Sequence, residues 1–155
     1  SSHRGLNMKY LALLAVLCSK MVTAQKPPPQ GNIDITVKGL SNLEGTLYCT
    51  LFSEDKKESF PTKEKDKWGS VQGQPVKVDK DMQATCTFEK VPHGTYAIAG
   101  YFDENKNNEF DMMFFIPQEP YFASQDAKGS FGPPKFQDAK FDHRGAVTQL
   151  LAKAQ

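Results

Sequence analysis

The chain has 155 residues, which is enough for one domain with a hydrophobic core of its own. Its 19 Lys and Arg residues nearly balance 18 Asp and Glu residues, and three of the basic ones lie in the first 24 positions. The rest of the chain is therefore slightly acidic, which gives no electrostatic reason to expect a nucleic acid or an anionic membrane as a partner.

The first 24 residues have the pattern of an export signal. Met8 resembles a natural start, so we interpret residues 1–7 as an upstream remnant. Lys9 precedes an apolar run over 10–18 that is too short to span a bilayer, and small or modest residues at 22–24 suit a cleavage before Gln25. We predict a signal peptide over 8–24 and a secreted or periplasmic protein with no transmembrane segment in its mature part.

A lipid anchor on Cys18 is the alternative to cleavage before Gln25. A lipidated Cys normally follows a small residue, whereas Leu17 precedes this one. We therefore interpret Cys18 as part of the signal peptide.

The remaining chain divides into a Pro-rich linker over 25–31 and a single domain over 32–155. Within the domain, apolar and polar residues alternate over 32–38, 47–52, 76–78, 84–88 and 95–102, which is the period of half-buried strands. The small residues Ala97 and Ala99 on the last of these predict close packing of another layer.

The other segments are less regular. Residues 53–68 are highly charged and suit either a solvated loop or a short surface helix, residues 112–116 are apolar, and residues 117–134 are irregular and rich in Pro. Residues 136–142 and 146–151 offer one or two closing strands, the second of which could instead be a helical turn. Together the pattern predicts an all-β fold, an antiparallel β-sandwich of about seven strands as in immunoglobulin-like domains, with a long irregular C-terminal segment.

Two cysteines remain after the leader. Cys49 and Cys86 each share the apolar parity of their strands, so both are expected to point inward. In an oxidising compartment they could form a disulfide. Two separate buried thiols are equally compatible, because the sequence does not fix the distance between their Cα atoms.

The segment 103–111 has the ligand pattern of a calcium loop. Oxygen-bearing side chains stand at Asp103, Asn105, Asn107 and Asp111, the offsets 1, 3, 5 and 9 of such a loop, and the Glu109 carbonyl falls at offset 7. Ca²⁺ prefers several hard oxygen ligands of this kind. These five residues are therefore the candidate metal ligands, with Ca²⁺ as the candidate cofactor.

Two departures weaken the calcium pattern. Asn108 occupies the usual Gly position, and Phe114 stands where a bidentate Glu is expected. Any affinity should then be modest, roughly 10⁻⁴ to 10⁻³ M. The simpler interpretation, which we favour slightly, is a polar turn whose Asx side chains bond their own backbone.

Catalytic signatures are weak. His93 lies in a Pro-Gly turn and His143 near a strand end, and neither accompanies a nucleophile motif or a phosphate-binding Gly-rich loop. A glycosidase-like pair of Asp103 and Asp111 would need an unusual surface loop as its cradle. Several aromatic residues follow the main strand and are expected to pack the irregular segment onto the sandwich or, if exposed, to contact a sugar or a partner: Tyr101, Phe110, Phe114, Phe115, Tyr121, Phe122 and Phe131.

Four motifs in order resemble one known family. They are GTYAI at 94–98, DENKN at 103–107, IPQEPY at 116–121 and GPPKFQDA at 132–139. Together they resemble the secreted bacterial family called domain of unknown function 2141. The resemblance implies an exported β-sandwich of transthyretin-like or carboxypeptidase-regulatory-like shape and brings no known activity. The sequence departs from the family at Phe102, often His, and at Asn108 and Phe115, where Gly is usual.

From these features we expect an exported, non-catalytic binding or accessory module rather than an enzyme. Its partner would be a protein or a carbohydrate. The alternative is a metal-dependent enzyme or transporter-linked subunit that uses the loop from Asp103 to Asp111.

Overall fold

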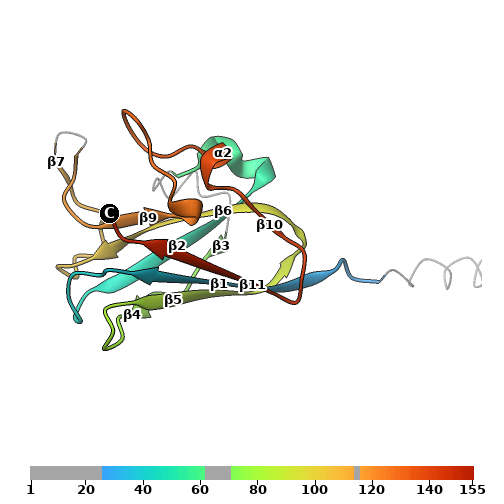
Figure 1. The fold of residues 1–155 in the computed structure, drawn as a ribbon, viewed down its shortest axis with the longest axis horizontal. Helices are drawn as coiled ribbons and strands as arrows, with labels where there is room; N and C mark the ends of the chain where they lie inside the picture. Colours follow the sequence, from blue (N-terminus) through green and yellow to red (C-terminus); the bar gives the residue numbers. More distant parts are fainter. Residues whose placement is uncertain (1–25, 62–70, 114–115) are drawn as a thin grey trace, which may run out of the picture.

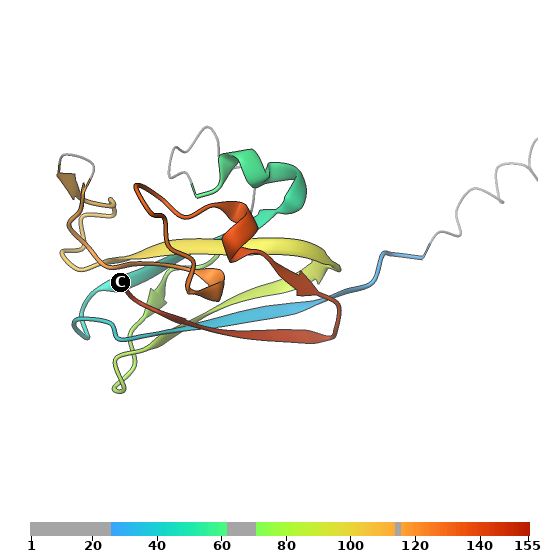
Figure 2. The ribbon, with the colours of Figure 1, turned by 45° about the horizontal axis from the view of Figure 1, so that its top comes forward.

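Two β-sheets pack face to face in the computed structural model, which describes residues 26–61, 71–113 and 116–155 (Figures 1 and 2). The predicted signal peptide over 8–24 lies outside these ranges. The small sheet has the order β11 (Val147–Lys153), β1 (Gln30–Lys38) and β5 (Ala84–Pro92).

The large sheet has the order β10 (Phe141–His143), β6 (Gly94–Asp103), β2 (Thr46–Ser53) and β3 (Val71–Gln72). Two short strands extend it: β4 (Val76–Lys77) pairs with β2, and β9 (Tyr121–Ala123) pairs with β6. A separate hairpin joins β7 (Met112–Met113) to β8 (Ile116–Pro117). The predicted all-β, sandwich-like fold is confirmed. One pair, β1 with β11, is parallel rather than antiparallel.

The core between the sheets is formed by the apolar side chains at every second position of the strands. Ile33, Ile35 and Val37 on β1 are completely buried, while the residues between them are only partly covered. The inward residues of the large sheet, including Leu47 and Ile98, face them and are equally buried. Fully burying such a side chain stabilises the fold by about 1.5–3 kcal/mol, so the alternation itself selects which face of each strand turns inward.

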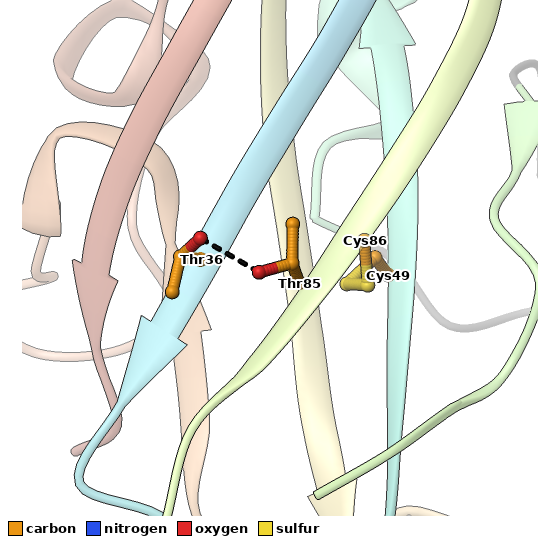
Figure 3. The surroundings of a disulfide bond; sticks show 4 residues. All are labelled: Thr36, Cys49, Thr85 and Cys86. Atoms are coloured by element: carbon orange, nitrogen blue, oxygen red, sulfur yellow. Dashed lines mark hydrogen bonds between the residues drawn. A yellow bond between two sulfur atoms is a disulfide. The ribbon is translucent and has the colours of Figure 1, made fainter. Parts of the chain in front are cut away.

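A disulfide joins the two sheets through this core. Cys49 on β2 and Cys86 on β5 are bonded, with their Cα atoms 6.5 Å apart, and both side chains are almost completely buried. Figure 3 shows the bond beside the Thr36–Thr85 hydrogen bond, which links β1 to β5 at 2.8 Å. Of the two arrangements that the sequence allows, the bridge is therefore the one that forms.

A second apolar layer covers part of the outer face of the large sheet. Ala97 and Ala99 are buried there against the C-terminal segment, as their small size predicts. This layer includes Phe52, Ala123, Ala127, Phe136 and Ala139, with Phe60 packed against it. The covering segment contains two short helices, η3 (Ser124–Asp126) and α2 (Phe136–Ala139). A third, η1 (Glu54–Ser59), is a short surface helix of the kind that the charged segment 53–68 allows.

The predicted strand over 136–142 is wrong in its first part. Phe136 and Ala139 are three residues apart and both buried, so one helical turn places them together on the sheet. Only the last two residues of that segment are in a strand, β10, which spans Phe141–His143. The strand predicted over 146–151 is confirmed as β11, at Val147–Lys153.

Removing the disulfide should destabilise the domain strongly. The bond closes a loop with a sequence separation of 37, and the chain-entropy model then gives a contribution of about 4 kcal/mol. Urea unfolding of the Cys49→Ala/Cys86→Ala double variant should show a free energy of unfolding lower by about 2–4 kcal/mol. Dithiothreitol should lower the midpoint of the wild-type chain and leave that of the double variant unchanged. Equal stabilities would contradict a structural role for the bridge.

Candidate functional site

The acidic loop, residues 103–111, begins where β6 leaves the large sheet. Asp103 is the last residue of β6, opposite Thr46 on β2, and it is completely buried. Its two carboxylate oxygens accept the backbone N–H groups of Asn107 at 3.3 Å and Asn108 at 2.8 Å. The buried charge is thus satisfied by the loop that follows it, which curls the chain back towards the strand end.

Two residues of the loop adopt left-handed backbone geometry. The φ angles are 60° at Lys106 and 62° at Asn108. Asn tolerates this region better than most residues, so Asn108 can make the sharp turn for which Gly is usual. The departure noted in the sequence is therefore accommodated.

Two further candidate ligands, Asn105 and Asn107, bond to the Asp111 carboxylate. The Asn105 side-chain amide donates to Asp111 Oδ2 at 2.7 Å, and that of Asn107 donates to both carboxylate oxygens, at 2.9 and 3.1 Å. The amide oxygens point at the backbone instead, since Asn105 Oδ1 accepts the N–H of Asn107 and Asn107 Oδ1 accepts that of Glu109. The arrangement is the self-bonded polar turn that the sequence analysis allows, with Asp103, Asn105, Asn107 and Asp111 brought together and the Glu109 side chain exposed.

Glu119 completes the site, although it is not among the residues that the sequence pattern singles out. Its side chain is buried, and its two oxygens accept the backbone N–H of Glu104 at 3.0 Å and of Asp111 at 3.1 Å. One carboxylate therefore ties the start of the loop to its end. The only local signal is a Glu between two prolines, at 117 and 120, which does not reveal a partner fifteen residues away.

Burial raises the pKa of Glu119 above its ordinary value. Its two backbone hydrogen bonds favour the ionised form and lower the pKa, and the neighbouring charges of Asp111 and Asp103 raise it again. The charges of Asp111 and Asp103 thus act on the Glu119 carboxyl at this end of the sandwich. Among the described residues, however, no group of three or more His, Cys, Asp or Glu side chains is placed to hold a metal ion.

An aromatic row lies beside the acidic loop on the outer face of the large sheet. Tyr48 and Tyr101 stack with ring centroids 5.2 Å apart, Phe110 follows at 5.1 Å from Tyr101, and Tyr121 lies 6.5 Å from Phe110. The Tyr48 hydroxyl donates to Asn108 Oδ1 at 2.7 Å. The row therefore braces the loop against the sheet.

The pKa of Tyr101 is raised to about 12, chiefly by burial and then by the neighbouring Tyr48, Asp103, Glu119 and Glu109. The phenol is therefore a neutral hydrogen-bond donor at ordinary pH. Of the other predicted aromatic residues, Phe122 is buried in the core, Phe131 is fully exposed, and Phe114 and Phe115 lie outside the described residues.

His93 and His143, the histidines of the described residues, form a separate structural pair. His143 is completely buried, with Nδ1 2.6 Å from Thr148 Oγ1 and Nε2 3.1 Å from the Val91 carbonyl. The ring of His93 packs edge-on to it at 5.3 Å, and His93 Nε2 contacts the Gly145 carbonyl at 3.0 Å. Both nitrogens of His143 are occupied in connecting β10 to β5 and β11, a role that strand parity alone does not reveal.

These features define a disulfide-linked β-sandwich with an acidic, aromatic-braced loop at one end of its large sheet. Residues 35–150 match the family DUF2141, described as uncharacterised protein conserved in bacteria. The chain belongs to this family, and the resemblance seen in its four motifs is confirmed. No curated protein and no solved structure matches the chain. In the described ranges no helix is both long and apolar enough to cross a membrane.

The raised pKa of Glu119 predicts a pH-dependent stability. Because the folded state disfavours the ionised carboxyl, the contribution of Glu119 is fully present below the ordinary pKa of 4.5 and is lost as the pH rises through the folded pKa. The free energy of unfolding of wild type, relative to Glu119→Gln, should therefore fall as the pH rises above 4.5. Urea unfolding over a pH series measures this difference, and Glu89→Gln at an exposed position of β5 is the matched control. A difference that is flat, or that grows with pH, would contradict the assignment.

Proposed function

We propose that this protein acts outside the cytoplasm as a non-catalytic binding or accessory module whose acidic loop takes up Ca²⁺ weakly. The observation that carries the proposal is the convergence of Asp103, Asn105, Asn107 and Asp111. A loop that splayed these side chains into solvent could not gather their oxygens around one ion.

The ligand set suits calcium after a small change. Asn105 and Asn107 now turn their NH₂ groups towards Asp111. A half-turn of each amide would bring an oxygen there instead, at the cost of the bonds that these oxygens accept from the backbone N–H groups of Asn107 and Glu109. Asp103 and Asp111 would supply the charge, and the Glu109 carbonyl a further oxygen. Only two of these ligands are charged and the bidentate Glu is lacking, so the affinity falls in the millimolar class.

The non-catalytic part of the proposal is supported by the way the titratable groups are used. Both ring nitrogens of His143 and both oxygens of Glu119 are engaged in holding the fold. A metal-dependent enzyme or transporter-linked subunit would need a concave substrate site beside the acidic loop. One hollow among the described residues lies away from that loop, on the outer face of the small sheet, where it is lined by Asp34, Thr36, Thr85, Gln149, Leu150 and Leu151.

Export is supported by the inter-sheet disulfide, since such bonds form and persist in oxidising compartments. A protein or carbohydrate partner would meet the aromatic row and the acidic loop together, because the rings of Tyr48 and Tyr101 lie directly beside Asn108.

Calcium should stabilise the mature chain. With a Kd of about 1 mM, 10 mM Ca²⁺ adds about 1.4 kcal/mol, or a rise in melting temperature of about 3–6 °C. Asp111→Asn removes one of the two charged ligands and should abolish most of the rise. Asp103→Ala should also abolish it, but it leaves the Asn108 backbone N–H without its acceptor and removes one of the two acceptors of the Asn107 N–H, so it lowers the starting stability as well.

The measurement is differential scanning fluorimetry with CaCl₂ and with MgCl₂ at equal ionic strength. Asp138→Asn, at an exposed position of α2, is the matched control and should keep the calcium response. The calcium site would be refuted by an absent response, by an equal response to Mg²⁺, or by a full response in Asp111→Asn.

A further inference from the structure

The small sheet ends at β11, whose strand partner in the described part of the chain is β1 (Figure 1). An open strand edge presents backbone N–H and C=O groups that can pair with another strand. Which residues of β11 present these groups follows from three hydrogen bonds.

Even-numbered residues face β1. The Ala146 carbonyl accepts the N–H of Asn32 at 2.8 Å, and the N–H of Ala154 donates to the Lys38 carbonyl at 2.9 Å. Odd-numbered residues therefore face away, and the N–H of Lys153 accordingly donates to Asp126 Oδ1 at 2.9 Å. The backbone groups of Val147, Gln149 and Leu151 thus lie along this edge, and η3 packs against its C-terminal end at Lys153.

The side chains of the same three residues lie on the outer face of the small sheet. Val147 is 51% exposed, Leu151 is 64% exposed, and Gln149 between them is also exposed. No charged residue interrupts the strand before Lys153. Edge strands are commonly protected by Lys, Pro or a bulge, and this edge has none of these over 147–152.

We propose that this edge pairs with the same edge of a second copy of the chain, antiparallel, with Gln149 opposite Gln149 on a two-fold axis. Val147 then lies opposite Leu151 of the second copy, and Leu151 opposite its Val147. Each of these pairs exchanges two backbone hydrogen bonds, and each apolar pair covers two exposed side chains. The small sheets of the two copies become one continuous sheet.

The register follows from the occupied groups. A shift of one pair towards the C-terminal end of the strand would require the N–H of Lys153, which Asp126 already accepts. A shift the other way would require the Gly145 carbonyl, which His93 Nε2 already contacts. Centring on Gln149 uses all three open residues and avoids Lys153. A two-fold rotation about Gln149 places an apolar residue opposite an apolar residue and Gln149 opposite Gln149. The strand therefore matches a second copy of itself, which favours that copy over an unrelated strand.

Cysteine cross-linking tests the pairing directly. Hydrogen-bonded antiparallel partners have Cα atoms about 5.5 Å apart, within the range that a disulfide spans. The mature Gln149→Cys chain at about 100 µM under mild oxidation should form a covalent dimer on a non-reducing gel, because a five-residue strand pair is a small contact and the dimer is weak. Thr87→Cys, exposed on the same face of β5, is the matched control and should cross-link much more slowly.

The register has its own test. Val147→Cys mixed with Leu151→Cys should yield a mixed covalent dimer, and each variant alone should yield little. Gln149→Lys should shift sedimentation velocity towards the monomer by like-charge repulsion on the axis. If Gln149→Cys cross-links no faster than Thr87→Cys, the edge pairing is overturned. If Val147→Cys alone cross-links as well as the mixture, the proposed register is overturned. None of these readouts depends on calcium.

Discussion

Burial of one side of every long strand is the constraint from which the rest of this structure follows. The pairing of β2 with β6 sets Cys49 opposite Gly100 and Thr50 opposite Ala99. Successive cross-strand pairs therefore form rows of side chains that point alternately to the inner and the outer face of the large sheet. The inner rows make the core and bring Cys49 within reach of Cys86. The outer rows carry the second layer, the aromatic row and, at the strand end, Asp103. A slip of one residue would exchange these faces, which would lose the core and the disulfide together.

The acidic loop shows how a buried charge can organise an irregular segment. Asp103 is held by two backbone N–H groups of the loop, and Glu119 holds the two ends of the same loop. These bonds satisfy the carboxylates, but they also bring Asp103, Asp111 and Glu119 together, and their mutual repulsion contributes to the raised pKa of Glu119. A bound cation would reduce this repulsion, so the same geometry that fixes the loop would also favour the binding of a positively charged ligand.

The strands were predictable because their signal is local. Alternation identified the faces of β1, β2, β5 and β6, the parity of the cysteines, and the layer over Ala97 and Ala99. The same local pattern could not identify Glu119 or His143, whose partners are distant in the chain. It also misread the segment 136–139, because two apolar residues in a four-residue stretch do not distinguish a helical turn from a strand until the surface beneath them is known. The candidate ligands were found by spacing, whereas the carboxylate that holds them in place was not.

The two edges of the small sheet differ in a way that bears on association. The β5 edge carries Glu89 and Lys90, the φ angle of Lys90 is 53°, and the register with β1 shifts between Gly31 and Ile33. Charges and a local irregularity of this kind discourage a further strand. β11 pairs with β1 in an unbroken register, and its edge residues Val147, Gln149 and Leu151 are uncharged. This edge therefore lacks both the charges and the irregularity of the β5 edge. An asymmetric sheet of this design would stop at two copies, because pairing through β11 leaves only the two protected β5 edges at its ends.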